Sequence, residues 1–154
     1  MDLGKTPNLR EVRFYVPCPD NFDQQHGGTD MVTGPARLLG TTPSDHRLEM
    51  IFLHFDCRNL DFRDEIQAHD IESHLRGTNW AALDSVVMQI TRSIKHDLKL
   101  SICLDYVVNW RSPSQRTKDE DCLKDWGQKY LPQASGLLNL ILDVATSYNE
   151  FVDC

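Results

Sequence analysis

The sequence lacks any apolar run approaching the ~20 residues of a membrane-spanning helix. Its first residues, MDLGKTPNLREVRF, contain no apolar segment of the kind found in secretory signal peptides. Its five cysteines are widely spaced and form no CxxC pair, which argues against a zinc ribbon or a thioredoxin-type redox site. We therefore expect a cytoplasmic or nuclear protein with free thiols and no membrane partner.

Signatures of common enzyme classes are missing as well. No GxSxG or HExxH motif occurs, and the stretches HGGTD and GTN lack the strand and helix that flank a phosphate-binding loop. The formal net charge of -7 disfavours attraction to nucleic-acid phosphates. The densest basic stretch, residues 92–99, also includes Asp97. We expect no cofactor, no nucleic-acid partner and no catalytic activity.

The residues that are present indicate one globular domain over 1–154. Apolar residues make up 40% of the chain and charged residues 25%, a balance typical of a soluble protein with a core. Alternating or continuous apolar residues predict four strands, at 9–16, 47–55, 98–104 and 136–144. In the last of these, one face is expected to carry Leu138, Leu140, Leu142 and Val144.

Two segments have the pattern of helices. In 80–95, apolar residues recur at helical spacing, and Thr78 or Asn79 is placed to cap the first turn. A second helix is expected to begin at Thr117, because Glu120 three residues later completes a capping box, and to end at Pro132. Segment 20–45 is rich in Gly, Pro, Thr and Asp and is predicted to be a long loop.

The order of these elements predicts an α/β fold. The strand centres are separated by about 38, 50 and 39 residues, more than the 20–29 residues of a compact leucine-rich repeat. Strands joined through crossover helices pair in parallel. We therefore expect an irregular, leucine-rich-repeat-like layer of helices and strands with a mostly parallel four-stranded sheet.

Several short stretches carry a family resemblance. TPNLREVRFYV, NWAALDSVV, LKLSICLD and KYLPQASGLLNL resemble the C-terminal leucine-rich-repeat-like region of fungal, mainly basidiomycete, F-box and hypothetical proteins. The matching positions lie within residues 7–144 and are Trp80, Leu83, Asp84, Leu131, Pro132, Gly136, Leu137 and Leu138. The resemblance implies packing rather than catalysis. Because no F-box is found in this sequence, adaptor binding does not carry over, and we expect a single domain or a terminal piece of a longer array. An exposed sheet edge would then favour self-association.

One polar region offers candidate chemistry. His46, His54, His69 and His74 lie near Cys57 in the sequence, and these residue types bind zinc. Their spacings fit no known finger, and structural histidines are the simpler interpretation. Positions 54 and 57 of a continuing strand point to opposite faces, which disfavours a Cys–His pair. The nearby acids Asp56, Asp61, Asp64 and Glu65 are interleaved with Arg58 and Arg63 and indicate a solvated loop.

The tryptophans divide into two kinds. Trp80 and Trp126 lie on helical stripes and are expected to pack, whereas Trp110 follows a strand and is a candidate for exposure. Our hypothesis is a non-catalytic protein–protein interaction module of unknown partner, with candidate partner-binding residues Trp110, Arg111, Arg58 and Arg63. The alternative is a small enzyme or metal-binding protein that uses His54, Cys57 and the acidic loop.

Overall fold

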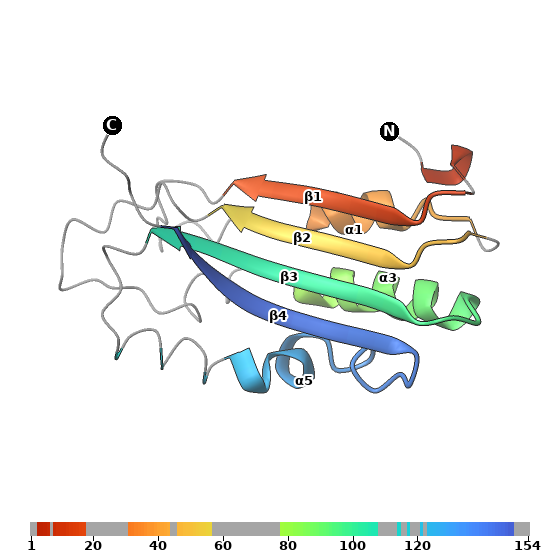
Figure 1. The fold of residues 1–154 in the computed structure, drawn as a ribbon. Coiled ribbons are helices and arrows are strands. Elements are labelled where there is room, and N and C mark those ends of the chain that lie inside the picture. The colour runs from red at the N-terminus through yellow and green to blue at the C-terminus, as the bar shows by residue number, and fades with distance from the viewer. Residues whose placement is uncertain are drawn as a thin grey trace.

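The chain forms an α/β layer with an all-parallel sheet. A computed structural model describes residues 3–6, 8–17, 31–43, 46–56, 78–107, 114, 117, 121 and 123–149. Four strands lie side by side in sequence order (Figure 1). They are β1 (Glu11–Pro17), β2 (Met50–Asp56), β3 (Leu98–Val107) and β4 (Leu140–Asn149). Each neighbouring pair is parallel, so the predicted α/β class and parallel four-stranded sheet are confirmed.

The helices cover one face of this sheet. In Figure 1 they lie behind the strands, with α1 (Thr33–Leu39) near β1 and β2, and α3 (Trp80–Ser93) near β3. The short α5 (Trp126–Tyr130) lies beside β4, and a 3-10 helix, η1 (Leu3–Lys5), lies beyond the amino end of β1. None of the helices among the described residues has the length and apolar character needed to cross a bilayer.

The core lies between the sheet and the helices. In β2 every second residue, Ile51, Leu53 and Phe55, is fully buried. The same alternation in β3 buries Leu98, Leu100, Ile102 and Leu104. Since burial of each such side chain stabilises the fold by roughly 1.5–3 kcal/mol, these two central strands supply much of the apolar driving force.

The fourth strand begins later than the sequence pattern predicts. Residues 131–139 form a series of turns, in which the Leu137 amide donates to the Ala134 carbonyl and the Leu140 amide to the Leu137 carbonyl. Leu138 is fully exposed, so its predicted place on the apolar face is wrong. Leu140, Leu142 and Val144 do pack against the core, as predicted.

The predicted loop over 20–45 is wrong for residues 33–39, which form α1. Gly34 and Pro35 favour a loop when the sequence is considered alone. Both lie in the first turn of α1, where backbone N–H groups need no partner within the helix. Burial of Ala36 and Leu39 then holds α1 against the rest of the core.

The predicted helix 80–95 is observed as α3. The side-chain oxygen of Asn79 accepts a hydrogen bond from the Ala82 amide at 3.3 Å, so Asn79 is the N-cap. Leu83, Val87 and Ile90 are buried along one side, as the helical spacing predicts. In the second predicted helix, residues 117, 121, 123 and 124 are helical, and α5 spans Trp126–Tyr130, just before Pro132; Glu120 of the predicted capping box lies outside the described residues.

A buried carboxylate joins α3 to the turn that follows α5. Asp84 is 1% exposed, and its two oxygens accept the amide hydrogens of Ala134 at 2.8 Å and Gln133 at 3.1 Å. Beside it, the rings of Trp80 and Trp126 pack edge to face with centroids 4.7 Å apart. The expected packing of both tryptophans is confirmed, since both are nearly inaccessible.

Polar side chains also fasten the amino ends of neighbouring strands. Each contact links one helix–strand unit to the next, and each joins residues 47 or 48 positions apart. The pairs are His46 Nε2 with Ser93 Oγ (3.2 Å), His96 Nε2 with the Leu48 carbonyl (2.9 Å), and Asn139 Nδ2 with the Thr91 carbonyl (2.9 Å). These contacts help to fix the register of neighbouring strands. The register in turn decides which side chains lie next to one another across the sheet.

We predict that Asp84→Ala lowers the free energy of unfolding by about 3 kcal/mol, because two amides lose a charged acceptor. Asp84→Asn keeps one acceptor oxygen and is expected to cost about 1–2 kcal/mol. Urea unfolding followed by circular dichroism measures both values. The exposed Asp97→Ala is the control, expected within about 0.5 kcal/mol of the parent. Equal stability of the parent and both Asp84 variants would contradict the assigned role.

Candidate functional site

The candidate site is the sheet face that points away from the helices, here called the open face. It is turned toward the viewer in Figure 1, and no described helix or strand covers it. Strand alternation and register place on it Glu11, Arg13, Tyr15, Met50, Phe52, His54, Asp56, Lys99, Ser101, Cys103, Asp105, Ile141, Asp143, Ala145 and Ser147. The paired strands therefore present a broad surface that carries charged, aromatic, small polar and apolar side chains.

An aromatic cluster occupies the β1 and β2 part of the open face. The Tyr15 ring lies 5.4 Å from the His54 ring, and the Phe52 ring lies 6.1 Å from the same imidazole. The Arg13 guanidinium stands over Phe52 at 5.4 Å from the ring centroid. Tyr15 is 68% exposed. The cluster combines flat aromatic rings with polar groups, which are the Tyr15 hydroxyl, the His54 imidazole and the Arg13 guanidinium.

His54 also contacts an acid on the neighbouring strand. Its Nε2 lies 3.5 Å from Oδ2 of Asp105, whose side chain is 5% exposed. The parallel register aligns His54 with Cys103 and so brings Asp105 within reach. Sequence reasoning singled out His54 but missed Asp105, because the two lie far apart along the chain. Asp105 could have been found by predicting how β2 and β3 align, because their register brings its side chain next to His54.

Cys103 is a free thiol beside this pair. Burial raises the pKa of the Cys103 thiol, and the negative charges of Asp105 and Asp143 raise it further. A raised pKa reduces the fraction of thiolate at neutral pH, and the thiolate is the nucleophilic form. The arrangement of His54, Cys103 and Asp105 thus differs from that of an activated cysteine nucleophile.

The open face carries an excess of negative charge. Its carboxylates are Glu11, Asp56, Asp105 and Asp143, against the cations Arg13 and Lys99. Both cations pair within the face, Arg13 with Glu11 and Lys99 with Asp143 at 3.4 Å. The carboxyl ends of β2 and β3, which carry Asp56 and Asp105, are therefore the acidic end of the surface.

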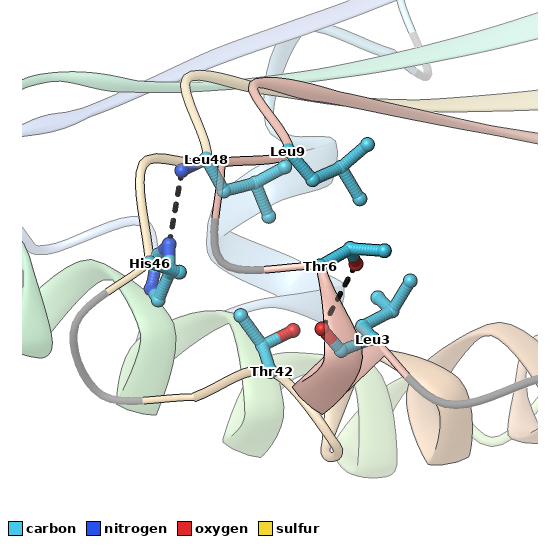
Figure 2. Close-up of a pocket in the computed structure, with 6 residues that line it drawn as sticks. All are labelled: Leu3, Thr6, Leu9, Thr42, His46 and Leu48. Carbon is cyan, nitrogen blue, oxygen red and sulfur yellow. Dashed lines mark hydrogen bonds between the residues drawn. The ribbon is translucent and has the colours of Figure 1, made fainter.

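The structure separates two of the histidines that the sequence offered as metal-binding candidates, His46 and His54. His46 precedes β2, and its Nδ1 accepts the Leu48 amide at 3.0 Å, so it has a structural role. Figure 2 shows it among the residues that line a small pocket, which are Leu3, Thr6, Leu9, Thr42, His46 and Leu48. His54 lies near the other end of β2. Across the described ranges, no three His, Cys, Asp or Glu side chains are grouped to hold a metal.

The remaining candidates lie outside the described residues. These are the metal and nucleophile candidates Cys57, His69 and His74, the acids Asp61, Asp64 and Glu65, and the partner-binding candidates Trp110, Arg111, Arg58 and Arg63. Among the described residues, the structure brings His54 next to Asp105, Cys103 and Tyr15, which lie far from it in the sequence. Of the residues named from sequence, His54 and Asp56 belong to the open face.

Comparison with protein-family models, with curated proteins and with solved structures finds no match to this chain.

We predict that Cys103 reacts slowly with iodoacetamide at neutral pH, because its pKa is raised by burial and by Asp105 and Asp143. Its rate should rise with pH through a midpoint above that of an exposed cysteine. Asp143→Asn removes one of the negative charges and is expected to lower that midpoint. Site-resolved mass spectrometry of the labelled chain measures the rate at Cys103 alone.

The matched control is Asp97→Asn, which removes an exposed charge just before the amino end of β3. It should leave the Cys103 profile unchanged because the intervening distance weakens the interaction. A midpoint at or below the ordinary cysteine value would contradict the assigned environment.

Proposed function

We propose that the protein is a non-catalytic protein–protein interaction module, similar to the leucine-rich-repeat-like region it resembles, whose open face docks a protein partner. The observation that carries the proposal is the aromatic cluster with the exposed Tyr15 at its outer side, on a sheet face that no described element covers. The opposite face is used for the core. Among the described residues, the open face is thus a broad surface that is available to bind a protein partner.

Aromatic side chains on rigid strands are well suited to anchor a partner. Tyr15 offers a large contact area and loses little conformational entropy when bound, since it has few rotatable bonds. His54 of β2 lies beside it with ring centroids 5.4 Å apart, and Phe52 lies 6.1 Å from the same imidazole. Truncation of the exposed ring would remove the centre of the contact.

The charge of the open face favours a basic partner. Its carboxylates outnumber its cations, and the whole chain carries a formal net charge of -7. Opposite charge on a partner speeds encounter and sets orientation more than it raises affinity. A segment with lysine or arginine next to an apolar residue would complement both the more accessible carboxylates of the open face, Glu11, Asp56 and Asp143, and the aromatic cluster.

We predict that peptides selected on the immobilised protein from a random displayed library are enriched in basic and apolar residues. Their affinity should fall roughly tenfold for Tyr15→Ala, the loss expected when a central aromatic anchor is removed. Isothermal titration calorimetry with one selected peptide measures this change. Raised salt should weaken the same complex by screening.

The matched control is Gln89→Ala, an exposed position on α3 behind the sheet. It should bind the peptide as the parent does. Unchanged affinity for Tyr15→Ala, or a loss confined to Gln89→Ala, would show that the open face is not the recognition surface.

A further inference from the structure

We infer that copies of this chain associate head to tail, with the outer edge of β4 in one copy pairing in parallel with the outer edge of β1 in the next. In the described part of the chain, β1 and β4 are the two edges of the sheet. Edge strands present backbone groups that can template further pairing. This inference is independent of the proposed docking on the open face.

Backbone orientation decides which groups face outward. Along a parallel strand, successive residues turn their N–H and C=O alternately to the two sides. The Leu98 amide donates to the Asn139 carbonyl, so odd-numbered residues of β4 face β3 and even-numbered ones face outward. The Met50 amide donates to the Arg10 carbonyl, so even-numbered residues of β1 face β2 and odd-numbered ones face outward.

The existing rows of the sheet define a register for the next copy. Glu11 is aligned with Met50, Met50 with Lys99, and Lys99 with Ile141. Continuing that row sets Ile141 beside Glu11 of the second copy, and Leu142 beside its Val12. In this register the outward amide of Leu142 meets the outward carbonyl of Glu11, so the hydrogen-bond pattern of the sheet continues without a break.

Side chains on both faces fit this register. On the open face, Asp143 stands beside Arg13 of the second copy, an opposite-charge pair, and the small Ala145 stands beside its Tyr15. On the core face, Leu142 stands beside Val12, and Val144 beside Phe14. All four of these apolar residues are partly buried in one chain. Pairing would therefore cover apolar surface as well as backbone.

Other registers fit less well. The alternation of outward groups and of faces permits only shifts by two residues. A shift in one direction sets Asp143 beside Glu11, which places like charges together. A shift in the other sets Asp143 beside Tyr15 and leaves Arg13 without it. The continuous register is thus favoured by charge, which is the reason to identify the occupant of the edge as a second copy.

The interface is heterologous, so association does not close after two copies. The average mass in solution is expected to rise steadily with protein concentration, measured by sedimentation velocity or light scattering. A parent protein that stays monomeric up to about 1 mM, a concentration at which even a millimolar dissociation constant is detectable, would overturn the inference.

Two blocked variants test the direction of pairing. Arg13→Pro removes an outward donor from β1, and Thr146→Pro removes one from β4, while the bonds of each strand to its inner neighbour remain. Each variant alone is expected to be monomeric. A 1:1 mixture should form a dimer that grows no further, because each chain keeps one intact edge. Dimers of either variant alone, or no dimer in the mixture, would overturn head-to-tail pairing.

A second pair of variants avoids proline and keeps the test valid if either of those chains unfolds. Arg13→Glu and Asp143→Arg are each expected to weaken association about two- to fivefold, the effect of an exposed ion pair. Their 1:1 mixture should recover association, since it restores opposite charges between chains. Equal association by the parent, the two variants and their mixture would overturn the register. Circular dichroism checks that each variant is folded.

Discussion

The rest of the layer depends on two hydrogen bonds, which the buried carboxylate of Asp84 accepts from the backbone amides of Gln133 and Ala134. It holds the turn after α5 against α3, and that turn leads directly into β4. The packing of Trp80 on Trp126 requires the same placement. A charged group this deeply buried is stable because both oxygens accept hydrogen bonds. By positioning the turn that leads into β4, this contact also positions the fourth strand of the open face.

The fold could be predicted to the extent that local patterns decide it. Alternating or continuous apolar residues identified the four strands, and the crossover helices implied parallel pairing; the structure confirms the strands, with β4 starting four residues later, and their parallel pairing. The errors arose where tertiary contacts override local preference. Residues 33–39 look like a loop because of Gly34 and Pro35, yet burial makes them a helix. Leu138 continues an apolar alternation, yet the preceding turns leave it exposed.

The candidate site was less predictable, because it is assembled by register. His54 was identified from sequence, but its neighbours were sought nearby, at Cys57 and the acidic loop. The structure places it next to Asp105 and the aromatic ring of Tyr15, each from another strand, while Cys57 lies outside the described residues. Asp84 and Leu131 were recognised as members of a motif, but the hydrogen bonds that join the two segments depend on how a helix meets a turn, which no local pattern records.

The contacts that fasten the amino ends of the strands have a consequence for folding kinetics. Each joins residues 47 or 48 positions apart, so every unit must close a long loop before its contacts form. The length-dependent part of that closure entropy is roughly 3 kcal/mol each time. Slow folding is therefore expected for a chain of this size. Because β2 and β3 have neighbours on both sides, their amides should exchange with solvent last as the native layer opens from its edges.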